Sequence, residues 1–183
     1  MYSKRKLSNR VIVLIDGSNF YHRLKEIGVH NQLEFDYYQF ANYLSRDRKI
    51  VWRNYYVGVV RAKPNDKKAQ RLRRNQQRLF AALKKAQFGL YFGYLLKSDK
   101  KYHEKGVDVN IAVDLLVGAY EDQYDTAILV SSDTDLIPVI LKVRQLGKKV
   151  EYVGFGHKPS LAMIANCDFS RLLGKEDLKP FIK

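Results

Sequence analysis

The sequence predicts a single α/β domain of three layers, in which a mostly parallel central sheet lies between two layers of helices. Short apolar runs of strand length alternate with longer segments whose apolar residues recur at helical spacing. This alternation is typical of a parallel sheet covered on both faces. A chain of 183 residues fits one domain, here 1–183, with 1–9 as a basic N-terminal extension and 154–183 as a C-terminal extension.

The first half of the chain predicts two strands and three helices. Residues 11–15 are an apolar run too short for a helix, and it ends in Asp-Gly-Ser-Asn, which indicates a buried parallel strand. Helices are expected over 20–27 and 37–44. Residues 50–60 are rich in β-branched and aromatic side chains and predict a second strand. A basic amphipathic helix follows over 67–86.

The second half repeats the alternation. Residues 88–96 resemble a strand, and the charged segment 97–106 is expected to be a loop. Residues 107–119 are apolar on most sides, which predicts a buried helix. A strand over 126–130 leads to a helix over 135–145 that closes near Gly147. A last strand over 149–153 and a short helix over 159–165 complete the prediction.

The charge balance indicates the class of partner. The chain has 33 Lys and Arg against 19 Asp and Glu, a net charge of +14, which favours nucleic acid over an anionic membrane surface. No stretch approaches the roughly 20 apolar residues of a membrane span. The one cysteine excludes an internal disulfide framework and favours a reducing compartment. We therefore expect a cytoplasmic protein with no membrane partner, and the oligomeric state stays open.

Much of the positive charge lies in one segment. Between Arg61 and Lys85 the only acid is Asp66, so the usual i,i+4 ion pairs cannot form along this helix. A charged helix face is usually just solvated, and that interpretation stays open. The scarcity of acids favours phosphate binding instead. The residues expected to bind RNA are Lys67, Lys68, Arg71, Arg74, Arg78 and Lys105.

The scarce carboxylates lie where apolar segments begin or end. Asp16 and Asn19 follow the first strand, Asp108 opens the helix over 107–119, and Asp133 and Asp135 follow the strand over 126–130. An unpaired carboxylate beside apolar residues is costly, whereas Mg²⁺ or Mn²⁺ needs hard oxygen ligands. Since ligands of open α/β sheets bind at the carboxyl ends of strands, these acids are expected to meet at one edge of the sheet.

Each acid also has a structural alternative. Asp16 could belong to a simple turn with Asn19 as a helix cap, and Asp108 could be a first-turn acid favoured by the helix dipole. Asp133 and Asp135 compete for one cap position, which leaves the other free for a metal ion.

Further polar and aromatic residues could support the site. Asp114, about a third of a turn around the helix from Asp108, could support it from behind or hold a basic partner. Phe20 and Tyr21 could stack on unpaired bases or belong to the core. The serines that could help to place a phosphate are Ser18, Ser131 and Ser132. The four histidines form no ligand-spaced pair, so a zinc site is not expected.

The motifs DGSNFY, KGVDVNIAVD and SSDTDLIPVI, in this order, resemble the NYN domain family, the LabA-like branch of the PIN-like nuclease superfamily. The resemblance covers about residues 11–153. It implies a PIN-like, Rossmann-like fold and metal-dependent ribonuclease activity. It also implies Mg²⁺ or Mn²⁺ ligands at Asp16, Asp108 and Asp133, with Asn19 and Asp135 as close catalytic support.

The function predicted from these features is a metal-dependent ribonuclease. It would cut single-stranded or structured RNA endonucleolytically by hydrolysing phosphodiester bonds. The alternative is a noncatalytic RNA-binding or assembly module on the same fold. A dehalogenase-like phosphatase does not fit, because its pattern needs an acid where this chain has Ser18.

Overall fold

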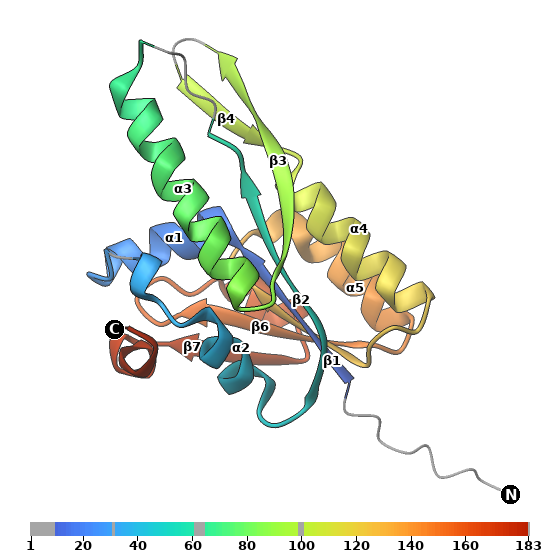
Figure 1. The fold of residues 1–183 in the computed structure, drawn as a ribbon. Coiled ribbons are helices and arrows are strands. Elements are labelled where there is room, and N and C mark those ends of the chain that lie inside the picture. Colours follow the sequence, from blue (N-terminus) through green and yellow to red (C-terminus); the bar gives the residue numbers. More distant parts are fainter. Residues whose placement is uncertain (1–9, 31, 61–64, 99–100, 183) are drawn as a thin grey trace, which may run out of the picture.

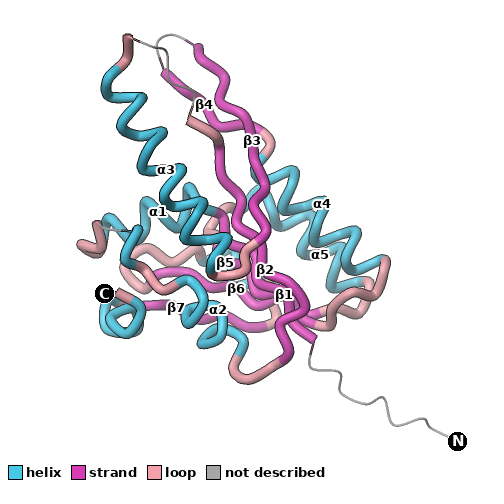
Figure 2. Tube along the Cα trace, in the orientation of Figure 1, coloured by secondary structure: helices cyan, strands magenta, loops and turns pink. Residues whose placement is uncertain are grey.

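The computed structural model describes residues 10–182, apart from 31, 61–64 and 99–100, so the basic extension 1–9 lies outside it. The strands are β1 (Arg10–Asp16), β2 (Lys49–Gly58), β3 (Gly89–Ser98), β4 (Lys101–Lys105), β5 (Thr126–Val130), β6 (Lys149–Phe155) and β7 (Phe169–Leu173). They form a seven-stranded sheet in the order β4-β3-β2-β1-β5-β6-β7 (Figures 1 and 2). All neighbours pair in parallel except β3 and β4, which confirms the predicted α/β class with a mostly parallel sheet.

Helices cover both faces of this sheet (Figure 1). They are α1 (Gly17–Glu26), α2 (Tyr37–Ser45), α3 (Lys67–Lys85), α4 (Val107–Tyr120), α5 (Ile137–Gln145), α6 (Leu161–Asn166) and α7 (Lys175–Leu178). Three 3₁₀ turns accompany them, η1 (Gln32–Glu34), η2 (Thr134–Leu136) and η3 (Lys179–Phe181). No helix of the described ranges is long and apolar enough to cross a membrane.

The alternation of side chains along β1 creates two cores. Val11, Val13 and Ile15 face the layer of α1, α2 and α3, whereas Ile12 and Leu14 face α4, α5 and α6. All five are fully buried, as expected for a central parallel strand with helices on both sides. The apolar run that predicted this strand is therefore apolar because neither face meets water.

The prediction was wrong at β4 and missed β7. The charged segment predicted as a loop contains β4, which pairs antiparallel with β3 from Tyr94↔Lys105 to Ser98↔Lys101. Charged residues are common in edge strands, because they hinder pairing of the free edge with another chain. The other edge strand, β7, pairs in parallel with β6, but Phe169 and Leu172 are exposed, so its sequence lacks a continuous buried pattern.

Helix α1 begins at Gly17, three residues before the predicted start, because Asp16 caps it. Gly17 packs so closely on β2 that an added Cβ would lie 2.3 Å from the Tyr55 ring and 2.8 Å from the Tyr56 carbonyl oxygen. The helix predicted over 135–145 is divided into η2 and α5, with a proline in the first turn of α5, where its missing N–H has no intrahelical partner to lose.

Helix α3 and the β3–β4 hairpin extend to one side of the rest of the molecule (Figure 1). The side chain of Gln76 ties α3 to the end of β2. Its Nε2 donates to the Gly58 carbonyl oxygen at 2.8 Å, and its Oε1 accepts from the Val60 N–H at 2.9 Å. Phe80 packs against Phe92 with ring centroids 5.1 Å apart. These contacts hold α3 beside the carboxyl end of β2.

Candidate active site

The candidate site lies where the strand order reverses, between β1 and β5. From β1 the chain continues to β2 on one side, whereas β5 continues to β6 on the other. Ile15 and Val130 are paired, so the residues that follow them emerge side by side at the carboxyl edge of the sheet. This edge is the usual ligand position in open α/β folds.

Asp16 is the most enclosed acid of the site, with only 5% of its surface exposed. One carboxylate oxygen accepts from the Asn19 N–H at 3.0 Å, and the other accepts from the Ser131 hydroxyl at 2.8 Å. Burial raises the pKa of Asp16 to about 6, and the charges of Asp108 and Asp133 add to this rise. Asp16, not Asn19, is therefore the cap of α1, and Asn19 lies inside the first turn.

Asp133 follows β5 and caps η2. Its Oδ1 accepts from the Asp135 N–H at 2.9 Å, and its own N–H donates to the Ser131 hydroxyl oxygen at 3.1 Å. The capping role thus belongs to Asp133, whereas Asp135 is exposed on η2. Capping uses one oxygen of Asp133, and the carboxylate still lines the pocket described below.

Asp108 comes from the first turn of α4. The preceding Gly106 has φ +84°, a left-handed conformation that suits glycine and turns the chain from β4 into α4. Burial raises the pKa of Asp108, and the negative charges of Asp133 and Asp135 raise it further. Arg144, a cation of the neighbouring helix α5, donates to Asp168 at 3.1 Å.

One polar pocket of about 410 Å³ brings Asp16, Asp108 and Asp133 together. Ser18 and Asn19 also line it. The three aspartates come from the carboxyl ends of β1 and β5 and from the start of α4. Segments far apart in the sequence therefore meet in one pocket. The remaining lining residues are His22, Arg23, Glu26, Gly106, Val107 and Lys158.

With the fold and this pocket described, comparison with known proteins assigns the family. A model of the NYN domain matches residues 10–173. This chain belongs to the NYN domain family. The family is nuclease-like and its three-layer fold is PIN-like, as the resemblance of the motifs implied.

A solved structure is similar to this NYN domain over the full length of both chains. It is a protein of unknown function from Vibrio parahaemolyticus, with a TM-score of 0.73 and 22% sequence identity. At this identity the likeness establishes the fold alone. No curated protein matches the chain.

Sequence reasoning missed the charged residues on α1. Asn19, His22, Arg23 and Glu26 are spaced i, i+3, i+4 and i+7, so they share one helix face, and that face lines the acidic pocket. Counting this spacing from Asn19, which was predicted, would have found His22, Arg23 and Glu26. Lys158, which was also missed, follows β6 and has no such signal in the sequence.

These charges partly pair with one another. Arg23 Nη1 donates to Glu26 at 2.9 Å, and His157 Nε2 lies 2.8 Å from the same Glu26 oxygen. The hydrogen bonds from His157 and Arg23 lower the pKa of Glu26 to about 2. Arg23 and Lys158 thus place positive charge on the wall of a pocket that otherwise carries carboxylates.

Two predicted supporting residues point elsewhere. Asp114 accepts hydrogen bonds from the Tyr56 hydroxyl at 2.6 Å and from Asn54 Nδ2 at 3.0 Å, behind β2. Burial and this carboxylate raise the pKa of Tyr56 well above its usual range. The Ser132 hydroxyl lies 2.9 Å from the Tyr152 hydroxyl. Of the predicted serines, Ser18 lines the acidic pocket and Ser131 is hydrogen-bonded to Asp16 and Asp133.

The donor set of the pocket suits a hard divalent cation. Carboxylate and amide oxygens are the ligands that Mg²⁺ and Mn²⁺ prefer. The pKa of Asp16 and of Asp108 is raised first by burial and then by neighbouring carboxylates, and a bound cation would oppose both effects. In the described part of the chain, no three His, Cys, Asp or Glu side chains are grouped tightly enough to form a complete cation site. The three aspartates match the ion in ligand chemistry and line one pocket, but their side chains are not drawn together into a complete ligand set in this structure.

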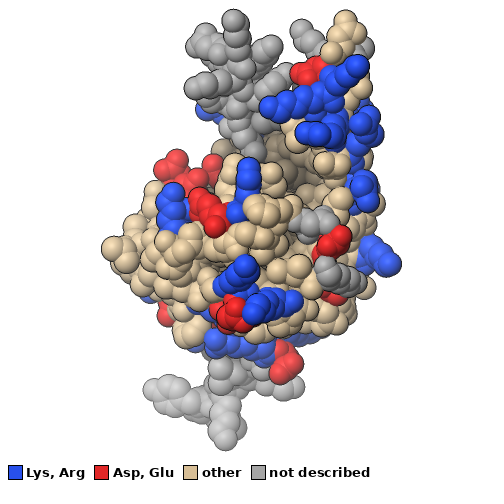
Figure 3. Space-filling view, turned by 90° about the vertical axis from the view of Figure 1, so that its left-hand side faces the viewer, with Lys and Arg blue, Asp and Glu red and all other residues tan. Residues whose placement is uncertain are grey.

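The basic helix is exposed as expected. Figure 3 shows Lys and Arg side chains gathered on the upper part of one face of the molecule, with few acids among them. Arg73, Arg74 and Arg78 line a shallow depression of about 440 Å³ with Gln70 and Gln77. All basic residues from Lys67 to Lys85 are exposed, whereas Arg61 and Lys63 lie outside the described residues.

Proposed function

We propose that this NYN domain is a metal-dependent ribonuclease that hydrolyses phosphodiester bonds within single-stranded or structured RNA. The observation that carries the proposal is the shared pocket of Asp16, Asp108 and Asp133 at the reversal point of the sheet. The net charge of +14 supports a polyanionic substrate, since a basic surface attracts nucleic acid whereas the acidic pocket by itself would repel phosphate. A cation between the acids and the phosphate reconciles the two.

The three aspartates would hold Mg²⁺ or Mn²⁺. The bound ion would supply a water of lowered pKa and stabilise the departing oxygen. The Ser131 hydroxyl, 2.8 Å from Asp16, keeps that carboxylate oriented. Arg23 and Lys158 line the same pocket and would attract the nonbridging phosphate oxygens, and the Asn19 amide would bind one of them without adding charge.

The test is cleavage of a circular single-stranded RNA in Mg²⁺ or Mn²⁺, because only an endonuclease opens a circle. We expect cleavage by the wild type and a loss of at least about 100-fold in Asp16→Asn and Asp108→Asn, since a transition-state electrostatic contact is worth about that much. Glu121→Gln is the matched control, because Glu121 is an exposed acid at the far end of α4. Equal rates in all four proteins would contradict the proposal.

One feature favours the second candidate, an RNA-binding or assembly module without catalysis. Along α4, an apolar row of Val109, Val113, Val117 and Tyr120 is exposed at helical spacing. Such a face is typical of a protein contact. RNA binding by the wild type without cleavage of either circular or linear RNA in Mg²⁺ or Mn²⁺ would favour this module over the nuclease.

A further inference from the structure

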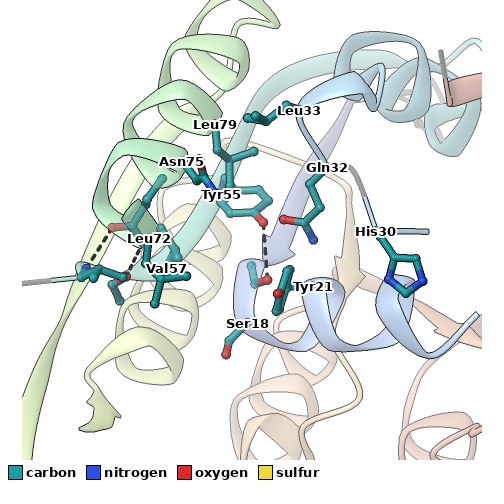
Figure 4. Close-up of a pocket in the computed structure, with 14 residues that line it drawn as sticks. Ser18, Tyr21, His30, Gln32, Leu33, Tyr55, Val57, Leu72, Asn75 and Leu79 are labelled. Atoms are coloured by element: carbon teal, nitrogen blue, oxygen red, sulfur yellow. Dashed lines mark hydrogen bonds between the residues drawn. The ribbon is translucent and has the colours of Figure 1, made fainter. Parts of the chain in front are cut away.

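A second cavity, of about 390 Å³, lies directly beside the acidic pocket. It is bounded by α1, α3, η1 and the carboxyl end of β2 (Figure 4). Ser18 lines both cavities, so the two meet at the first turn of α1. The acidic pocket is polar, whereas this neighbour is walled mainly by the side chains of Tyr21, Tyr55, Val57, Leu72 and Leu79.

We propose that this cavity binds an unpaired nucleobase of the RNA strand whose phosphate enters the acidic pocket. The inference rests on the proposed function and names its substrate class, an RNA that is single-stranded next to the cut. A base in a duplex is stacked on both faces and paired along one edge, so a nucleotide must be unpaired and unstacked to turn its base into such a cavity.

Aromatic and apolar groups suited to a base line the cavity. Tyr21 lines the cavity and keeps 41% of its surface exposed, whereas the preceding residue, Phe20, is fully buried in the core. Leu72 of α3 is 46% exposed and also lines the cavity. The Tyr55 ring is held from below by the hydrogen bond from its hydroxyl to the Gly17 carbonyl oxygen, at 3.4 Å. An exposed aromatic ring such as that of Tyr21 stacks on bases of any identity.

A polar group on the cavity wall has no hydrogen-bond partner among the described residues. Nε2 of Gln32 is enclosed and makes no hydrogen bond to the described part of the chain. In Figure 4 the Gln32 side chain reaches from η1 toward the centre of the cavity. An enclosed donor without an acceptor costs free energy, and the oxygen or nitrogen acceptors of a base edge would satisfy it. Gln76 also lines the cavity, but both polar atoms of its amide are already hydrogen-bonded to the end of β2 and the residues after it, so of the two glutamines Gln32 is the one left for a base.

Position and charge favour a nucleotide of a strand over a free apolar ligand. Lys68, Leu72, Asn75 and Leu79 follow one another at i, i+4, i+7 and i+11, so the cation of Lys68 lies on the same face of α3 as the cavity wall. A base in the cavity would thus have the acidic pocket on one side and a basic helix on the other. Its volume falls in the usual range for small-molecule sites, about 300–1,000 Å³.

The test separates the base from the backbone. Binding of a fluorescent single-stranded oligoribonucleotide is measured by anisotropy in chelator, beside an oligomer of the same length whose nucleotides are abasic. Tyr21→Ala should weaken binding of the normal oligomer about ten-fold and leave the abasic oligomer unchanged, because the variant has no ring on which the base can stack. Tyr21→Phe should bind like the wild type. Tyr120→Ala, which removes an exposed tyrosine on α4, is the matched control.

A second variant guards against misfolding. Leu72→Trp fills the cavity from an exposed position of α3, so it should fold and lose the preference for the normal over the abasic oligomer. Unchanged binding in both Tyr21→Ala and Leu72→Trp, an equal loss for the abasic oligomer, or no binding by the wild type would overturn the subsite. Because binding is measured without metal, its outcome is independent of cleavage. A base-dependent loss without any cleavage would keep the subsite and reject the nuclease, and cleavage with unchanged binding would do the reverse.

Discussion

The Ser131 hydroxyl donates a hydrogen bond to Oδ2 of Asp16 at 2.8 Å and so joins the ends of the neighbouring strands β1 and β5. The same hydroxyl oxygen accepts from the N–H of Asp133 at 3.1 Å. A single buried side chain therefore connects two of the three acids of the candidate site. Its position between them suggests that it orients the site as well as stabilising the fold.

Ser131→Ala should lower the free energy of unfolding by about 1–3 kcal/mol, because it removes a buried hydrogen bond to Asp16 and a partly buried one from Asp133. It should also reduce RNA cleavage, since Asp16 would lose a bond that orients it. Ser45→Ala is the matched control, because Ser45 is equally enclosed and its hydroxyl bonds the Asn42 carbonyl oxygen at 2.7 Å, away from the site. Urea denaturation and cleavage rates decide the matter. Equal effects of both variants on cleavage would show that Ser131 acts on stability alone.

The raised pKa of Asp16 makes stability depend on pH. Its pKa is about 6 in the folded chain and 3.8 in the unfolded one, so between these values the folded state holds the extra proton. Metal-free protein should therefore lose roughly 3 kcal/mol of stability as pH rises from about 4 to about 6. Asp16→Asn should remove that loss. Chemical denaturation across this range tests it, and an unchanged slope in the variant would assign the titration to another group.

Asp108→Asn should leave the metal-free protein as stable as the wild type or more stable, because repulsion from Asp133 and Asp135 falls. Stabilisation by Mn²⁺ should diminish, since a ligand that binds only the folded state raises stability by mass action. Thermal melts with and without Mn²⁺ measure both effects. Asp114→Ala is the contrasting variant. It should lose about 1–3 kcal/mol through Tyr56 and Asn54 yet keep the Mn²⁺ response.

Charge reversal at Arg71, Arg74 and Arg78 should weaken RNA binding and flatten its salt dependence, by about 0.7 in the logarithmic slope for each phosphate that the helix no longer neutralises. A control with the same change of net charge reverses Lys142, Lys149 and Lys175, which are exposed on other elements. Binding titrations over a range of salt concentrations compare the two triple variants. Equal slopes would mean that α3 acts through net charge and does not contact the strand.

Local patterns were enough to locate most of the fold and the three acids. The apolar runs of β1 and β5 are buried on both faces, so their composition alone identifies central parallel strands, and the polar residues that follow them must emerge at the carboxyl edge. For the same reason Asp16 and Asp133 could be placed together before any contact between them was known. Asp108 joined them because a buried helix starts at the same edge.

Only the tertiary structure decided the rest. The edge strands β4 and β7 exist because β3 and β6 offer them partners, and their own charged or half-exposed sequences do not show it. Asp114 lies on the same helix as Asp108, but its contact with Tyr56 removes it from the site. The cavity beside the acids is formed where α1, α3 and η1 meet. A sequence pattern determines whether a residue is buried on its own element, whereas the neighbour it meets depends on how distant elements pack.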